Sequence, residues 1–156
     1  MTQAITAWRQ AESSYAATDL QADRDWTRLW LTPDCFDSVR AVIYAATGRG
    51  DDGAVIAQAL TARLAGALGK SDAVSLINAA LALAAAGKFT TAANAGRQAL
   101  QAVRAAEATG CMPRASVVAE MIRDRGRLTS SSRAYIEDVE ATQRHLDSLQ
   151  MARASR

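Results

Sequence analysis

Alanine is by far the commonest apolar residue of this chain, and only two prolines, Pro33 and Pro113, interrupt its 156 residues. Alanine is the strongest helix former, whereas proline breaks helices. Each alanine buries little area, so a core built on alanine needs helices that pack closely. We therefore predict an all-α protein. A chain of this length suits one domain, which we place at residues 1–151, followed by a frayed tail at 152–156.

Apolar residues recur at helical intervals along most of the sequence. They predict helices over residues 2–20, 25–31, 33–47, 53–68, 72–86, 90–108, 113–125 and 129–151. Pro33 suits the first position of its helix, with Thr32 as the N-terminal cap. The helix over 72–86 carries almost no polar side chain, and a helix that is apolar nearly all round is expected at the centre of a fold.

Two turns between predicted helices look alike. Gly87-Lys88-Phe89-Thr90-Thr91 and Gly126-Arg127-Leu128-Thr129-Ser130 each combine a glycine, a basic residue, a bulky apolar residue and two hydroxyl residues. We expect the glycine to take the left-handed position that ends a helix. The apolar residue should pack between the two helices, and a hydroxyl should cap the second helix. A weaker third copy starts at Gly53, and its distance from Gly87 is that of one helical-hairpin repeat, about 34 residues.

The segment from Ala73 to Arg104 resembles a tetratricopeptide repeat, a helical hairpin of about 34 residues. The residues that carry this resemblance are Leu76, Ala79, Ala80, Leu83, Gly87, Phe89, Ala92 and Ala99. Gly96 and Arg104 depart from the pattern, since the family usually has a large apolar residue and a proline there. The resemblance implies a right-handed stack of antiparallel hairpins, with a compact helical bundle as the alternative.

The same resemblance implies a protein-binding module. In this family a groove lined by the first helix of each pair holds a peptide or a helix of the partner. Asn78 is a polar residue on such a first helix, so we include it among the expected binding residues.

Charge is distributed unevenly along the chain, although the formal net charge is only +2. Residues 1–52 carry a net charge of −3 and residues 53–156 a net charge of +5. Five of the basic residues fall within twenty positions: Arg114, Arg123, Arg125, Arg127 and Arg133. Such a cluster suits an acidic protein surface or phosphates, or is simply a solvated turn. No aromatic residues interleave it, which disfavours single-stranded nucleic acid.

Aromatic residues gather at the other end of the chain. Six of the eight lie within the first 44 residues: Trp8, Tyr15, Trp26, Trp30, Phe36 and Tyr44. Trp26 and Trp30 are four positions apart, so they share one face if their segment is helical. These side chains either fill the space between an N-terminal hairpin and the alanine-rich body, or form an exposed surface that anchors a partner.

Catalytic and metal-binding patterns are not recognised in the sequence. His145 is the single histidine and has charged neighbours, so we expect it at the surface. Cys35 and Cys111 lack metal-ligand spacing and are expected to be free thiols. The sequence has no glycine-rich phosphate loop, no signal-peptide pattern at its start and no apolar run long enough for a membrane span. We therefore expect cytoplasmic residence.

These observations favour a non-catalytic protein-interaction module, such as an adaptor, a relative of the small bacterial secretion chaperones, or an immunity-type protein. The expected partner-binding residues are Trp26, Trp30, Tyr44, Asn78, Arg123, Arg125, Arg127 and Arg133. We expect no cofactor and no membrane contact, and the partner is another protein or a second copy of the chain. The alternative is a nucleic-acid-associated regulatory domain that uses the patch from Arg123 to Arg133. An enzyme with a site at His145 or Cys35 is a third hypothesis.

Overall fold

The computed structural model describes residues 2–17, 32–126 and 128–155, and every regular element within these ranges is helical. The elements are α1 (Thr2–Ala17), α3 (Pro33–Ala46), α4 (Gly50–Arg63), α5 (Lys70–Ala85), α6 (Phe89–Ala105), a short 3₁₀ helix (Thr109–Cys111), α7 (Met112–Arg125) and α8 (Ser130–Ala154). The predicted all-α class is confirmed. The helix predicted over 25–31 lies outside the described residues.

Helix starts follow the predicted capping chemistry where a hydroxyl precedes the helix. Thr32 Oγ1 accepts a hydrogen bond from the Cys35 backbone N–H at 3.1 Å, and Pro33 occupies the first turn of α3. Thr129 Oγ1 accepts from the Ser132 backbone N–H at 3.2 Å and caps α8. Each bond satisfies a backbone donor that the helix itself leaves unpaired, so these two boundaries are set locally.

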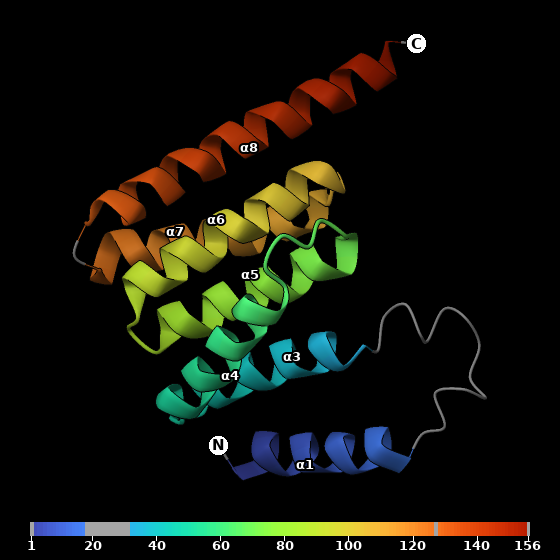
Figure 1. Ribbon diagram of the computed structural model, residues 1–156, viewed down its shortest axis with the longest axis vertical. Helices are drawn as coiled ribbons and strands as arrows, with labels where there is room; N and C mark the ends of the chain where they lie inside the picture. Colours follow the sequence, from blue (N-terminus) through green and yellow to red (C-terminus); the bar gives the residue numbers. More distant parts are fainter. Residues whose placement is uncertain (1, 18–31, 127, 156) are drawn as a thin grey trace.

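Consecutive helices pair and are layered in chain order (Figure 1). Helices α3 and α4 pack together, α5 packs on both, α6 packs on α5, and α8 packs on α6 and α7. The first helices of the three pairs also touch one another, since α5 contacts both α3 and α7. Helices α1 and α8 lie at opposite ends of the layered arrangement (Figure 1).

Helix α5 forms the centre of the core, as its apolar sequence predicts. Ten of its residues are buried, and they include Ala73, Ala79, Ala80, Leu76 and Leu83, which are fully inaccessible. Small side chains on α5 allow α3, α4, α6 and α7 to approach it together. The core around α5 is therefore stabilised by many contacts between small, closely packed side chains and not by a few large side chains.

Helix α1 is held on α3 by aromatic side chains. The rings of Trp8 and Phe36 lie 4.6 Å apart between centroids, and those of Tyr15 and Phe36 stack at 4.4 Å. An ion pair between Arg40 and Glu12, at 3.5 Å, adds to this contact. Part of the predicted aromatic cluster thus fills the space between the N-terminal helix and the alanine-rich body.

The two similar turns differ in the structure: the first has the predicted left-handed glycine and packed apolar residue, and the second has only the predicted hydroxyl cap. Gly87 is left-handed, with φ at +74°, whereas Gly126 is extended, with φ at −91°. Phe89 is partly buried against the core, whereas Leu128 is 45% exposed. Thr129 caps α8, but α6 begins without a side-chain cap.

Gly126 was therefore predicted wrongly as a left-handed residue, and the reason is steric. A Cβ on Gly126 would lie 2.6 Å from the Ile122 carbonyl oxygen and 3.1 Å from Phe89 Cγ. This glycine is required by the close approach of the α5–α6 turn to the end of α7. The prediction that Leu128 packs between helices is wrong as well, since its side chain is 45% exposed.

The third turn begins at Gly48 and not at Gly53, which corrects the predicted repeat. Gly48 has a positive φ of +83°, whereas Gly53 lies inside α4. A Cβ on Gly53 would lie 2.6 Å from the Ala41 carbonyl oxygen, so this glycine lets α4 pack closely on α3. Gly48, Gly87 and Gly126 are evenly spaced along the chain, and each precedes a basic residue. The interval between successive turn glycines is measured from Gly48 and not from Gly53. It is therefore longer than the tetratricopeptide unit.

Two helix ends also differ from expectation. Helix α4 ends at Arg63 and Gly66 adopts a positive φ, so Leu68, predicted as the last apolar residue of that helix, is exposed. Helix α8 continues to Ala154, where Arg153 lies 2.7 Å from Glu107. The frayed tail at 152–156 stays a prediction.

Candidate functional site

A pocket of about 160 Å³ opens where α3, α5 and α7 meet, and we call it the α3–α5–α7 pocket. Its lining is formed by Val39, Val42, Ile43, Asn78, Leu81 and Arg114. Four of these side chains are aliphatic, and Val39 is 39% exposed. Val117, one helical turn beyond Arg114 on α7, is 45% exposed. An apolar surface with a polar centre is thus open to solvent on the first helices of the three pairs.

Asn78 lines this pocket from α5 and is only 6% exposed. Its Nδ2 donates to Ser38 Oγ at 3.1 Å, and its Oδ1 accepts from Arg114 Nη1 at 3.4 Å. Ser38 Oγ in turn donates to the Cys35 carbonyl oxygen at 2.7 Å. These bonds satisfy a buried amide and link α3, α5 and α7 through one side chain.

Positive charge flanks the pocket. Arg114 is exposed, and none of the ion pairs between described residues involves it. Lys70 lies on the same stripe of α5 as Val74 and Asn78, at intervals of four residues. Arg114 thus supplies the positive charge of the pocket lining, and Lys70 lies about two helical turns before Asn78, at the start of α5.

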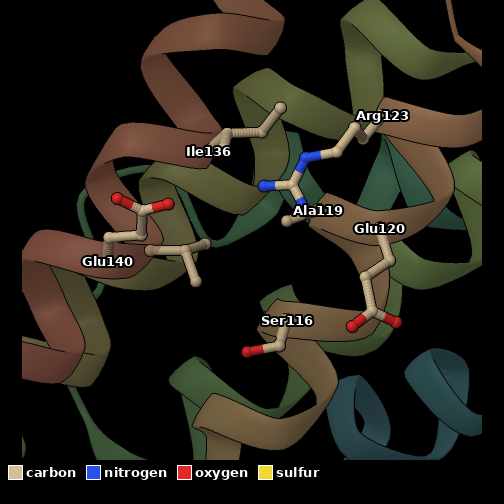
Figure 2. A pocket seen from close by; sticks show the side chains of 7 residues that line it. Ser116, Ala119, Glu120, Arg123, Ile136 and Glu140 are labelled. Atoms are coloured by element: carbon tan, nitrogen blue, oxygen red, sulfur yellow. The ribbon is translucent and has the colours of Figure 1, made fainter.

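A second pocket, of about 190 Å³, lies between α7 and α8, and we call it the α7–α8 pocket. It is lined by Ser116, Ala119, Glu120, Arg123, Ile136, Val139 and Glu140. Figure 2 shows Arg123 reaching from α7 toward Ile136 of α8, with the carboxylates of Glu120 and Glu140 on either side. This pocket thus has an apolar floor and charges of both signs at its rim.

The structure separates the residues that were predicted to bind a partner. Asn78 and Arg123 line the two pockets, whereas Arg125 and Arg133 are exposed outside them. Tyr44 is half-buried at the α3–α4 turn, and the Arg49 guanidinium covers its ring at 4.0 Å. Trp26, Trp30 and Arg127 lie outside the described residues.

Groups suited to catalysis are not brought together within the described residues. His145 is exposed on α8, as expected, and both cysteines are free. Burial raises the pKa of the Cys35 thiol and of the Cys111 thiol, although Arg114 and Lys70 act in the opposite direction on Cys111. Both groups are therefore held in the thiol form at neutral pH, which disfavours a nucleophilic thiolate. Nor are any three histidine, cysteine or acidic side chains of this part of the chain grouped as metal ligands.

Sequence reasoning missed most of the two pockets. Val39, Leu81, Glu120 and Glu140 were not selected, and Arg114 was named in the basic cluster but not among the expected partner-binding residues. The sequence of α5 carries no signal that separates the pocket residues, because the partly exposed Val74 and Leu81 alternate with the fully buried Leu76, Ile77 and Leu83.

Comparison of the chain with models of known protein families gave no match, and neither curated proteins nor solved structures matched it. The fold and the two pockets are thus the basis for a functional conclusion. Within the described part of the chain, no helix is both long and apolar enough to span a membrane.

Proposed function

We propose that this protein is a non-catalytic protein-interaction module that binds a segment of its partner in the α3–α5–α7 pocket. One observation carries the proposal: Val39, Leu81 and Arg114, from three different helices, form an open and largely apolar surface around the buried amide of Asn78. Small concave sites with an apolar lining and a few oriented polar groups are typical binding sites.

The position of this pocket supports a tetratricopeptide-like mode of binding. In that family the first helix of each hairpin lines the binding groove, and α3, α5 and α7 are the first helices of the three pairs here. The spacing between the turn glycines is longer than that of the family. The proposal therefore rests on which helices form the pocket and not on the length of the repeat.

The chemistry of the lining specifies what the partner should present. Aliphatic side chains of α3 and α5 suit one aliphatic residue of a peptide or helix. Arg114 forms no ion pair with a described carboxylate, so it suits an Asp, a Glu or a chain-terminal carboxylate beside that aliphatic residue. We propose an acidic-aliphatic protein segment as the ligand, whether the protein acts as an adaptor, a secretion chaperone or an immunity-type protein.

A peptide-display selection on the full chain tests this proposal. We expect the selected peptides to share an aliphatic residue next to an acidic residue. Binding should survive in Val55→Asp, a matched control on exposed α4 surface, and should fall at least roughly tenfold in Val39→Asp. Arg114→Glu should remove the preference for acidic residues while leaving the protein folded, as judged by circular dichroism.

Two results would contradict the proposal. One is a selection without any shared motif, and the other is a set of peptides whose binding is the same in Val39→Asp and in Val55→Asp. Either would remove the α3–α5–α7 pocket as the binding surface.

A nucleic-acid-associated function is the second candidate, favoured by Arg125 and Arg133. Both are exposed near the α7–α8 turn, and neither has an ion-pair partner among the described residues. Duplex DNA binding that weakens steeply with salt, and is lost in the Arg125→Ala, Arg133→Ala variant, would support it. Salt-independent or absent DNA binding would reject it.

A further inference from the structure

The α7–α8 pocket is a surface that the proposed function does not use. Helix α8 packs mainly on α6, where Tyr135 lies against Gly96 and Thr142 accepts a hydrogen bond from Arg104, and it meets α7 over a smaller contact. The two helices of this pair therefore leave a hollow between them, and its apolar lining is formed by Ala119, Ile136 and Val139. This hollow shares no lining residue with the α3–α5–α7 pocket.

The rim charges of this pocket are not neutralised within the described part of the chain. Arg123, Glu120 and Glu140 all line it, yet the ion pairs among the described residues involve none of the three. Figure 2 shows the Arg123 guanidinium directed into the pocket and not outward from the turn. A cation and two carboxylates thus border one small apolar hollow without pairing to one another.

We propose that the α7–α8 pocket is the contact surface for a second copy of this chain. In a dimer with a two-fold axis, the same surface of both copies forms the interface. Every contact between two different residues therefore occurs twice, with the roles of the two copies exchanged. Arg123 of one copy then faces Glu140 of the second copy, and the same pair forms again across the axis. The apolar floors, which include Ile136, become covered at the same time.

Charge complementarity identifies the second copy as the occupant. A surface with only one sign of charge would repel itself, whereas this pocket carries both signs around an apolar floor and is complementary to its own image. Leu128 is a further exposed apolar side chain, in the turn that joins these two helices. Stable dimers bury about 1,200 Å² or more in total, so we expect the rest of both helices to take part.

Sedimentation of the full-length chain over a range of concentrations tests this inference. We expect the unmodified protein to form a dimer. Arg123→Glu and Glu140→Arg should each weaken the dimer by roughly tenfold or more, since each places like charges together twice across the axis. The double variant Arg123→Glu, Glu140→Arg should restore dimerisation, because it exchanges the two signs. Arg125→Glu, a matched charge reversal outside the pocket, should leave the dimer unchanged.

Several outcomes would overturn the inference. A protein that is monomeric at every concentration excludes it. A dimer that Arg123→Glu leaves intact places the contact elsewhere, and a dimer lost equally in Arg125→Glu shows a general effect of charge. Failure of the double variant to dimerise, with helix content and thermal unfolding unchanged, also contradicts it. None of these outcomes affects the α3–α5–α7 pocket, so the proposed function is tested separately.

Discussion

The ring of Tyr135 on α8 packs directly over Gly96 on α6, and it occupies the space that any side chain at position 96 would need. A Cβ on Gly96 would lie 2.8 Å from Tyr135 Cζ and 2.9 Å from its Cδ2. The Tyr135 hydroxyl also donates to the Ala115 carbonyl oxygen of α7 at 2.9 Å. One tyrosine therefore holds three helices together, and the glycine that departs from the tetratricopeptide pattern is the residue that admits it.

Replacing Gly96 by alanine should destabilise the protein. Alanine improves the helix propensity of α6 by about 1 kcal/mol, but overpacking a core costs about 1–3 kcal/mol. We expect a net loss of about 1 kcal/mol in the free energy of unfolding, measured by urea denaturation. Gly110→Ala is the control, since nothing lies within 4 Å of a Cβ there. A stabilised Gly96→Ala variant would contradict the tight contact.

Alkaline pH should destabilise the protein through Tyr135. Burial raises its pKa above the ordinary tyrosine value near 10. The folded state therefore retains the proton more strongly than the unfolded state, so the stabilisation is complete below about pH 10 and is lost as the pH rises above that value. The free energy of unfolding should fall between about pH 9 and pH 11, and less steeply in Tyr135→Phe.

Tyr15, Cys35 and Cys111 also have raised pKa values, but they contribute equally to both proteins and cancel in this comparison. If the free energy of unfolding falls equally steeply with pH in the unmodified protein and in Tyr135→Phe, the pKa of Tyr135 does not differ between the folded and unfolded states. At neutral pH, the phenylalanine variant should lose about 1 kcal/mol through the missing hydrogen bond to Ala115.

Ser38 and Asn78 should be energetically coupled because their side chains share a buried hydrogen bond. In a double-mutant cycle of Ser38→Ala and Asn78→Ala, we expect a coupling energy of about 1 kcal/mol. Denaturation of the four proteins gives this value directly. Additive effects, within about 0.3 kcal/mol, would show that the bond across α3 and α5 contributes nothing to stability.

Gly87 and Gly126 should differ in how much stability they lose when they are replaced by asparagine. Gly87 has a positive φ and open space around it, so Gly87→Ala should cost about 1 kcal/mol and Gly87→Asn less, since asparagine tolerates the left-handed region. Gly126 has a negative φ but close neighbours in Ile122 and Phe89, so alanine and asparagine there should destabilise about equally. Thermal unfolding of the four variants would reveal the contrast. Rescue of position 126 by asparagine would point to backbone strain instead.

Part of the candidate site was predictable. Asn78 was selected because it is a polar residue on the first helix of the hairpin that resembles a tetratricopeptide repeat, and it lines the α3–α5–α7 pocket. Arg123 was selected as one of several neighbouring arginines, but only the structure directs it into the α7–α8 pocket. Tyr44 was also selected, but it lines neither pocket. The Arg49 guanidinium, from the turn that follows α3, covers its ring instead.

Local chemistry in the sequence by itself determined the helices, the caps at Thr32 and Thr129, and the central position of α5, because these depend on neighbours within a few residues and on helical periodicity. Tertiary structure decided the roles of Gly53, Gly96 and Gly126, which are set by how closely a distant helix or side chain approaches. It also decided the pockets, since Val39, Leu81 and Arg114 become neighbours only when three separate helices pack. Contacts between residues far apart in the chain leave no periodic trace in the sequence, and they depend on the shapes of both partners.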